Sequence, residues 1–88
     1  MRIWIKLFHE NRMLRDLVIE NDDTQMTRTK KVFATLEEAC MHFDLSVPLW
    51  LDSNIKDFKR NAKTRFRQDS FVEGIDFDYM EFQVIEED

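Results

Sequence analysis

Residues 35–67 read TLEEACMHFDLSVPLWLDSNIKDFKRNAKTRFR, and the rest of the chain is organised around them. This stretch holds two amphipathic segments separated by Pro48, which cannot extend a helix and biases Val47 away from helical angles. The first segment repeats apolar residues at positions i, i+3, i+4 and i+7 of one helix face: Leu36, Ala39, Cys40 and Phe43. We therefore predict a first helix that ends by about Leu45.

The start of this helix is predicted from the sequence Thr35-Leu36-Glu37-Glu38, which matches a capping box. The Thr35 hydroxyl can accept a hydrogen bond from the backbone N–H of Glu38, and the Glu38 carboxylate can reach back to the N–H of Thr35. Residues 27–33 are rich in Thr, Val and Phe, which favours a strand before the cap. A helix that runs into Thr35 is the competing interpretation.

The second helix is expected to begin after Asp52, which we predict as its cap. Its apolar residues recur at helical spacing on one side: Leu51, Ile55, Phe58 and Ala62. Its cations form a separate stripe at positions i, i+3, i+4 and i+7: Lys56, Lys59, Arg60 and Lys63. The sequence thus predicts a helix with an apolar side and a basic side.

Strand-like sequence flanks the helical pair on both sides. Residues 2–8 and 13–20 alternate in polarity around a polar turn at residues 9–12, which predicts a β-hairpin. Residues 64–67 indicate a short strand and residues 77–85 a strong final strand. We predict one α+β domain over residues 1–88, with an antiparallel sheet of four to five strands and two short helices on one face. Residues 86–88 are expected to form a frayed tail.

The strand alternation and the helix stripes together predict the core. The strands should contribute one apolar face: Ile3, Ile5, Leu7, Leu17, Ile19, Met80, Phe82 and Val84. The helices should cover this face with a second set: Leu36, Ala39, Cys40, Phe43, Ile55 and Phe58.

Composition narrows the class of protein. The 88 residues suit one small domain, and the 43% hydrophobic content with eight Phe is enough for a core. A single cysteine excludes an intrachain disulfide and suits a reducing compartment. The N-terminus lacks the pattern of a signal peptide, and no apolar run approaches the ~20 residues that span a bilayer. We expect a cytoplasmic protein with no membrane contact.

Charge is unevenly distributed along the chain. Residues 56–67 carry six Lys or Arg and one Asp, whereas residues 68–88 carry eight Asp or Glu and no cation. If the final strand lies beside the second helix, the two fields should largely cancel beyond a Debye length of ~8 Å. We expect this cancellation, which favours an acidic protein partner over nucleic acid.

Four segments carry a resemblance to known sequences: residues 43–46 (FDLS), 48–52 (PLWLD), 75–79 (IDFDY) and 84–88 (VIEED). Through them the chain resembles a family of small bacterial proteins of unassigned function. The likeness covers most of the chain. It implies no activity, substrate or functional residue.

The candidate chemical groups favour structural roles. Cys40 lies on an apolar stripe, which predicts a buried thiol, and with His9 and His42 it lacks the paired spacing of zinc ligands. The carboxylates near Gly74 lack the spacing of a calcium loop. We therefore expect no enzymatic activity, no metal and no cofactor.

An interaction module remains as the favoured function, most readily one that binds another protein. The candidate surface residues are Lys56, Lys59, Arg60, Lys63, Arg65, Arg67, Trp4 and Trp50. The alternative is a nucleic-acid-binding module that uses the basic segment 56–67, since Phe58 and Phe66 interleave with its cations. A pI of about 5.0 argues against this alternative.

Overall fold

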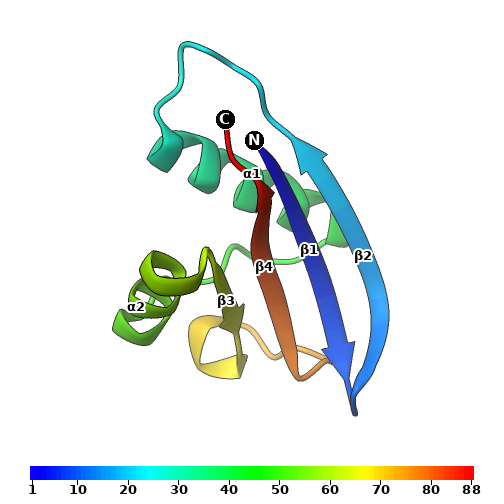
Figure 1. The fold of residues 1–88 in the computed structure, drawn as a ribbon. Coiled ribbons are helices and arrows are strands. Elements are labelled where there is room, and N and C mark those ends of the chain that lie inside the picture. The colour runs from blue at the N-terminus through cyan, green and yellow to red at the C-terminus, as the bar shows by residue number, and fades with distance from the viewer.

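A computed structural model describes residues 1–88, and its four strands form one antiparallel sheet. The strands are β1 (Arg2–His9), β2 (Arg12–Glu20), β3 (Lys63–Phe66) and β4 (Tyr79–Glu86). Their order across the sheet is β2-β1-β4-β3, so the N-terminal and C-terminal strands are neighbours in the middle (Figure 1). The predicted α+β fold with a four-stranded sheet is confirmed.

Two helices cover one face of this sheet and leave the other face open. They are α1 (Arg28–Phe43) and α2 (Asp52–Asn61), and a short 3-10 helix, η1 (Gln68–Ser70), follows β3. In Figure 1, α2 lies next to the edge strand β3, while α1 crosses the sheet near the two ends of the chain. Neither helix has the length and apolar character needed to cross a membrane.

The predicted hairpin is present, and its register results from a two-residue turn together with a β-bulge between Leu7 and Phe8, which shifts the pairing by one residue. Glu10 and Asn11 both have positive φ, at 50° and 65°, as a two-residue turn between twisted strands requires. The register places Ile3 opposite Ile19 and Ile5 opposite Leu17. The face with the branched apolar residues therefore points toward the helices, as the alternation predicted.

The start of α1 corrects the prediction made from the capping box. Thr27 is the N-cap, and its hydroxyl accepts the backbone N–H of Lys30 at 3.2 Å. Residues 27–33 are thus not a strand, and Thr35 lies buried in the middle of a 16-residue helix. Val32, four residues before Leu36, extends the buried stripe toward the N-terminus, and its burial outweighs the local preference for a strand.

The ends of α2 also differ from the prediction. Leu51 is the N-cap residue, and its backbone N–H donates to the Asn54 side chain at 3.0 Å, so Asp52 is the first helical residue rather than the cap. At the other end Ala62 adopts a left-handed conformation with φ of 53°. The helix stops there, and Lys63 belongs to β3 instead of the basic stripe of the helix.

Two members of the predicted core sets are not fully buried, and the core also holds five residues that were not predicted: Met1, Val32, Phe66, Phe71 and Phe77. Phe66, Phe82, Ile3, Ile5, Leu36 and Met80 are its largest fully buried apolar side chains. Leu17 is only partly buried, and Ile55 is 39% exposed. Ile55 was expected to pack against the sheet, but it lies on the flank of α2 where the two helices separate.

Candidate functional site

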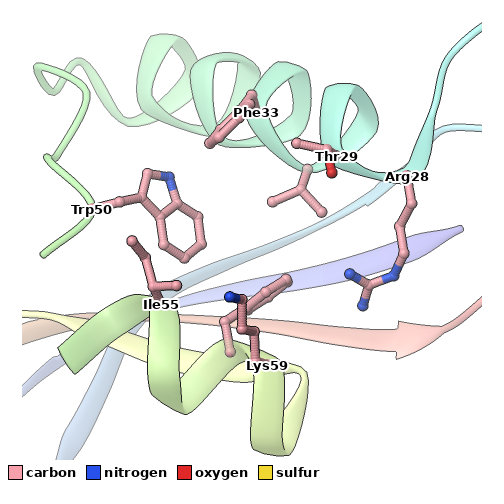
Figure 2. A pocket seen from close by; sticks show the side chains of 8 residues that line it. Arg28, Thr29, Phe33, Trp50, Ile55 and Lys59 are labelled. Atoms are coloured by element: carbon pink, nitrogen blue, oxygen red, sulfur yellow. The ribbon is translucent and has the colours of Figure 1, made fainter. Parts of the chain in front are cut away.

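A groove of about 290 Å³ lies between α1 and α2 and is the most apolar hollow of the molecule. Eight residues line it: Arg28, Thr29, Val32 and Phe33 from α1, Trp50 from the linker, and Ile55, Phe58 and Lys59 from α2. Figure 2 shows Trp50 at one end and Arg28 at the other, with Lys59 between them. The groove therefore runs from an apolar end to a cationic end.

Trp50 connects this groove with the core. Its ring makes edge-to-face contacts with Phe66 at 4.9 Å and Phe58 at 5.4 Å between centroids, and with Phe33 across the groove at 6.1 Å. These contacts hold the ring in place, because aromatic pairs prefer this geometry. Its indole N–H is buried without a hydrogen-bond partner. Trp50 is thus both a core residue and a wall of the groove.

Apolar side chains on the groove walls remain open to solvent. Phe33 is 49% exposed and Ile55 is 39% exposed. They lie on facing helices, since Phe33 comes from α1 and Ile55 from α2 (Figure 2). An exposed aromatic ring lies opposite an exposed branched side chain. A partner that covers both removes apolar surface from water, which lowers the free energy.

Three cations of α2 form no ion pair, and one of them, Lys59, lines the groove. Lys56, Lys59 and Arg60 are exposed, and no carboxylate lies within 4.0 Å of any of them. The carboxylates of the C-terminal strand and tail are paired elsewhere: Glu81 with Lys6 and Arg65, Glu86 with Arg2, Glu87 with Arg28, and Asp88 with Lys31. The acidic strand therefore makes no direct ion pair with α2, and the expected cancellation of the two fields at longer range stays a prediction.

Arg28 marks the cationic end of the groove and already holds a carboxylate. Its Nη2 lies 2.7 Å from Glu87 Oε1, and its Nε lies 2.9 Å from the same oxygen. The guanidinium carbon also lies 5.5 Å from the centre of the Phe58 ring. Residues 86–88 were expected to fray, but Glu87 forms an ion pair with Arg28, which lines the groove.

The open face of the sheet has a different organisation. One row across the four strands alternates in charge, because the register places Asp16, Lys6, Glu81 and Arg65 side by side. Lys6 Nζ lies 2.8 Å from Glu81 Oε2, and Arg65 Nε lies 3.2 Å from Glu81 Oε1. Lys6 and Glu81 are only 7% and 6% exposed. Lys6, Glu81 and Arg65 are therefore paired with one another within this row.

The cations of this row lower the pKa of Glu81. Burial acts to raise the pKa of its carboxyl, but hydrogen bonds from Lys6 and Arg65 outweigh burial and hold the pKa below the ordinary value for glutamate. Glu81 therefore stays ionised as the acceptor for both cations. Trp4 completes the row from the side, since its indole N–H donates to Asp16 at 2.9 Å and its ring lies 3.8 Å from Lys6 Nζ.

The predicted surface residues divide between the two sides of the molecule. Lys56, Lys59, Arg60 and Trp50 belong to the helix side. Lys63, Arg65, Arg67 and Trp4 belong to β3 and the open face: Lys63 lies opposite Gln83, and both arginines lie over the Tyr79 ring. The left-handed Ala62 separates the two groups, so the segment 56–67 is not one basic surface.

The four groove residues of α1 were missed from the sequence: Arg28, Thr29, Val32 and Phe33. All four lie in residues 27–33, which we predicted as a strand. A helix that starts at Thr27 places Phe33 next to Val32 at the edge of the buried stripe, where a half-exposed residue is expected. The spacing from Val32 to Leu36 was the signal that could have revealed it.

A second hollow of about 330 Å³ has a more polar lining and lies near the tip of the hairpin. It is lined by carboxylates from the loops at Asp44, Glu73 and Asp76, with Arg15 as its cation. Arg15 lies over the Phe43 ring at 4.8 Å. The chain therefore places an acidic hollow and a basic groove at different positions.

The remaining reactive side chains have no arrangement typical of a catalytic or metal site. Cys40 is buried as predicted, and burial raises the pKa of its thiol to about 11, so it stays protonated at neutral pH. His9 contacts Asp78 at 3.1 Å on the surface. No three side chains of the metal-binding types gather at one point.

No protein-family model, curated protein or solved structure matches this chain. The chemistry of its own surfaces is therefore the basis for a function. The helix side combines the more apolar of the two hollows with exposed cations that form no ion pair.

Proposed function

We propose that this chain is a small cytoplasmic, non-enzymatic module that binds an acidic segment of another protein. The binding surface is the helix side, where the unpaired Lys59 lines the groove between α1 and α2, and Lys56 and Arg60 lie on α2 outside the groove lining. The observation that carries this proposal is the adjacency of exposed apolar side chains, Phe33 and Ile55, to cations with no internal partner.

The apolar walls and the cations of this surface contribute to binding in different ways. Covering the apolar walls supplies affinity, at roughly 25 cal/mol for each Å² of apolar surface removed from water. The cations at Lys56, Lys59 and Arg60 attract and orient an acidic partner and raise its association rate. Because these cations have no carboxylate partner in the chain, a ligand carboxylate does not have to displace one.

The size of the groove favours a peptide segment. Its volume of about 290 Å³ holds one or two side chains, near the lower limit of about 300 Å³ for small-molecule sites. Groove recognition of this kind uses a few apolar anchors from a short segment of the partner. The open face suits this role less, because its charged row is already satisfied internally.

Fluorescence anisotropy with a labelled peptide tests the proposal. The probe is a short peptide with one leucine followed by two glutamates, and its control has lysines in place of the glutamates. We expect the acidic probe alone to bind, and we expect Lys59→Glu with Arg60→Glu to abolish binding. Equal binding of both peptides would contradict the proposal.

A second candidate, nucleic-acid binding, is favoured by the same unpaired cations. Only three of the six cations in residues 56–67 lie on α2, and the others belong to β3 and the open face. A ligand that contacts three cations should show a slope of about −2 to −3 in log K against log salt. Micromolar binding of single- or double-stranded DNA at physiological salt, lost in the same double variant, would favour this candidate over a protein partner.

A further inference from the structure

We infer that the groove recognises a segment with an apolar side chain next to carboxylates, and that Glu87 occupies its anion position until such a ligand replaces it. This inference rests on the proposed function and specifies the chemistry of the partner and a competitor within the chain.

The contact between Arg28 and Glu87 shows which chemistry the cationic end of the groove accepts. Two nitrogens of Arg28 approach Glu87 Oε1, at 2.7 and 2.9 Å, and Nε is also 3.3 Å from Oε2. Arginine takes a carboxylate in this geometry because its donors form a planar fork. Glu87 thus stands in for the carboxylate of a ligand.

This internal pair is exchangeable. The two side chains are 51% and 50% exposed, so water competes with the contact and salt screens it. By contrast, Lys6 and Glu81 on the open face are almost fully buried and cannot exchange partners without exposing a charge. A partner carboxylate can therefore replace Glu87 at Arg28 at little cost.

Lys59 provides a second anion position that no residue of the chain occupies. Figure 2 shows its ammonium group between the Trp50 end and the Arg28 end of the groove. An apolar side chain against Phe33, Trp50 and Ile55 would leave the following residues near Lys59 and then Arg28. The expected ligand is therefore an apolar anchor followed by two carboxylates, with the second in competition with Glu87.

Replacement of Glu87 tests this competition, with the leucine–glutamate peptide as the probe. Glu87→Gln should tighten binding by about two- to fivefold, since an exposed pair lowers the effective affinity by no more than that. Arg28→Gln should weaken binding and remove the effect of Glu87→Gln in the double variant. Glu86→Gln is the matched control, because Glu86 pairs with Arg2, which does not line the groove, and its affinity should equal that of the unchanged chain.

The outcomes separate this inference from the proposed function. If the unchanged chain binds the acidic peptide but Glu87→Gln leaves the affinity equal or lower, the competition is wrong and the proposed function stands. If no variant binds the acidic peptide, both fail. Sedimentation of the chain without peptide measures self-association. If the chain self-associates and Lys59→Glu abolishes this, the occupant of the groove is a second copy of the chain, and the inference is overturned. Far-UV circular dichroism of each variant separates loss of binding from loss of fold.

Discussion

Lys6 and Glu81 lie beside each other on the open face of the sheet and are nearly buried, whereas Lys56 and Lys59 on α2 are exposed and have no carboxylate partner. The open face brings opposite charges together through strand register, so its buried charged groups find their partners within the fold. The α2 cations meet no carboxylate in the chain. The comparison shows that a charge run in the sequence does not reveal by itself whether the fold uses the charges or leaves them for a partner.

The largest effect should come from the apolar layer between these two surfaces. Phe43→Ala removes a buried ring at the end of α1 and should lower the free energy of unfolding by about 3–5 kcal/mol. Phe33→Ala, on the exposed wall of the groove, should cost less than about 1 kcal/mol. Urea denaturation of both variants measures this difference. Equal losses would mean that the groove wall is part of the core.

A smaller loss is expected on the open face. Glu81→Gln leaves the buried ammonium of Lys6 without its carboxylate, which should cost about 2–3 kcal/mol. The control Glu86→Gln removes an exposed carboxylate that is 3.6 Å from Arg2 and should cost less than about 0.5 kcal/mol. If chemical denaturation finds the two variants equally stable, the row of alternating charges is not a stabilising feature.

Acidification should also lower the stability of the chain, because it protonates Glu81 on the open face. Because the pKa of Glu81 is lowered in the folded state, its contribution is complete above the ordinary glutamate pKa and is lost as pH falls through the folded value. We expect the unchanged chain to lose stability below about pH 4.3. The difference in stability between it and Glu81→Gln should narrow over the same range. A constant difference down to pH 2 would contradict the pairing.

Substitutions of two threonines, the N-cap of α1 and one inside it, should change the free energy of unfolding by about 1 kcal/mol in opposite directions. Thr27→Ala removes the side-chain acceptor for Lys30 N–H and should destabilise the chain by that amount. Thr35→Val replaces a buried hydroxyl that has no hydrogen-bond partner by a methyl of similar shape and should stabilise it by about 1 kcal/mol. Thermal melts of the two variants give the signs. Destabilisation by Thr35→Val would mean that the hydroxyl has a partner in solution.

The smallest effect on stability should come from the α2 cations. Lys56→Gln and Arg60→Gln should each change the free energy of unfolding by less than about 0.5 kcal/mol, since neither side chain has an ion-pair partner. The same two variants should weaken binding of the acidic peptide. A loss above about 1 kcal/mol would show that these cations support the fold and would remove the contrast with the open face.

The sequence by itself determined the hairpin, the final strand, the buried faces of both and the amphipathic character of the helices. These features depend on periodicity within one element, and a period of two or of 3.6 residues can be counted along the chain. The same reasoning correctly predicted that Cys40 is buried and that two helices cover one face of an antiparallel sheet.

The tertiary structure alone decided which threonine caps α1 and which charges meet. Thr27 and Thr35 both precede residues that suit a helix, and burial of Val32 against the sheet selects the earlier start. Lys6 and Glu81 are neighbours only because β1 and β4, from opposite ends of the chain, pair in one register. The left-handed Ala62 sends the cations before and after it to different sides. Each of these outcomes depends on contacts between distant segments, which local sequence patterns do not specify.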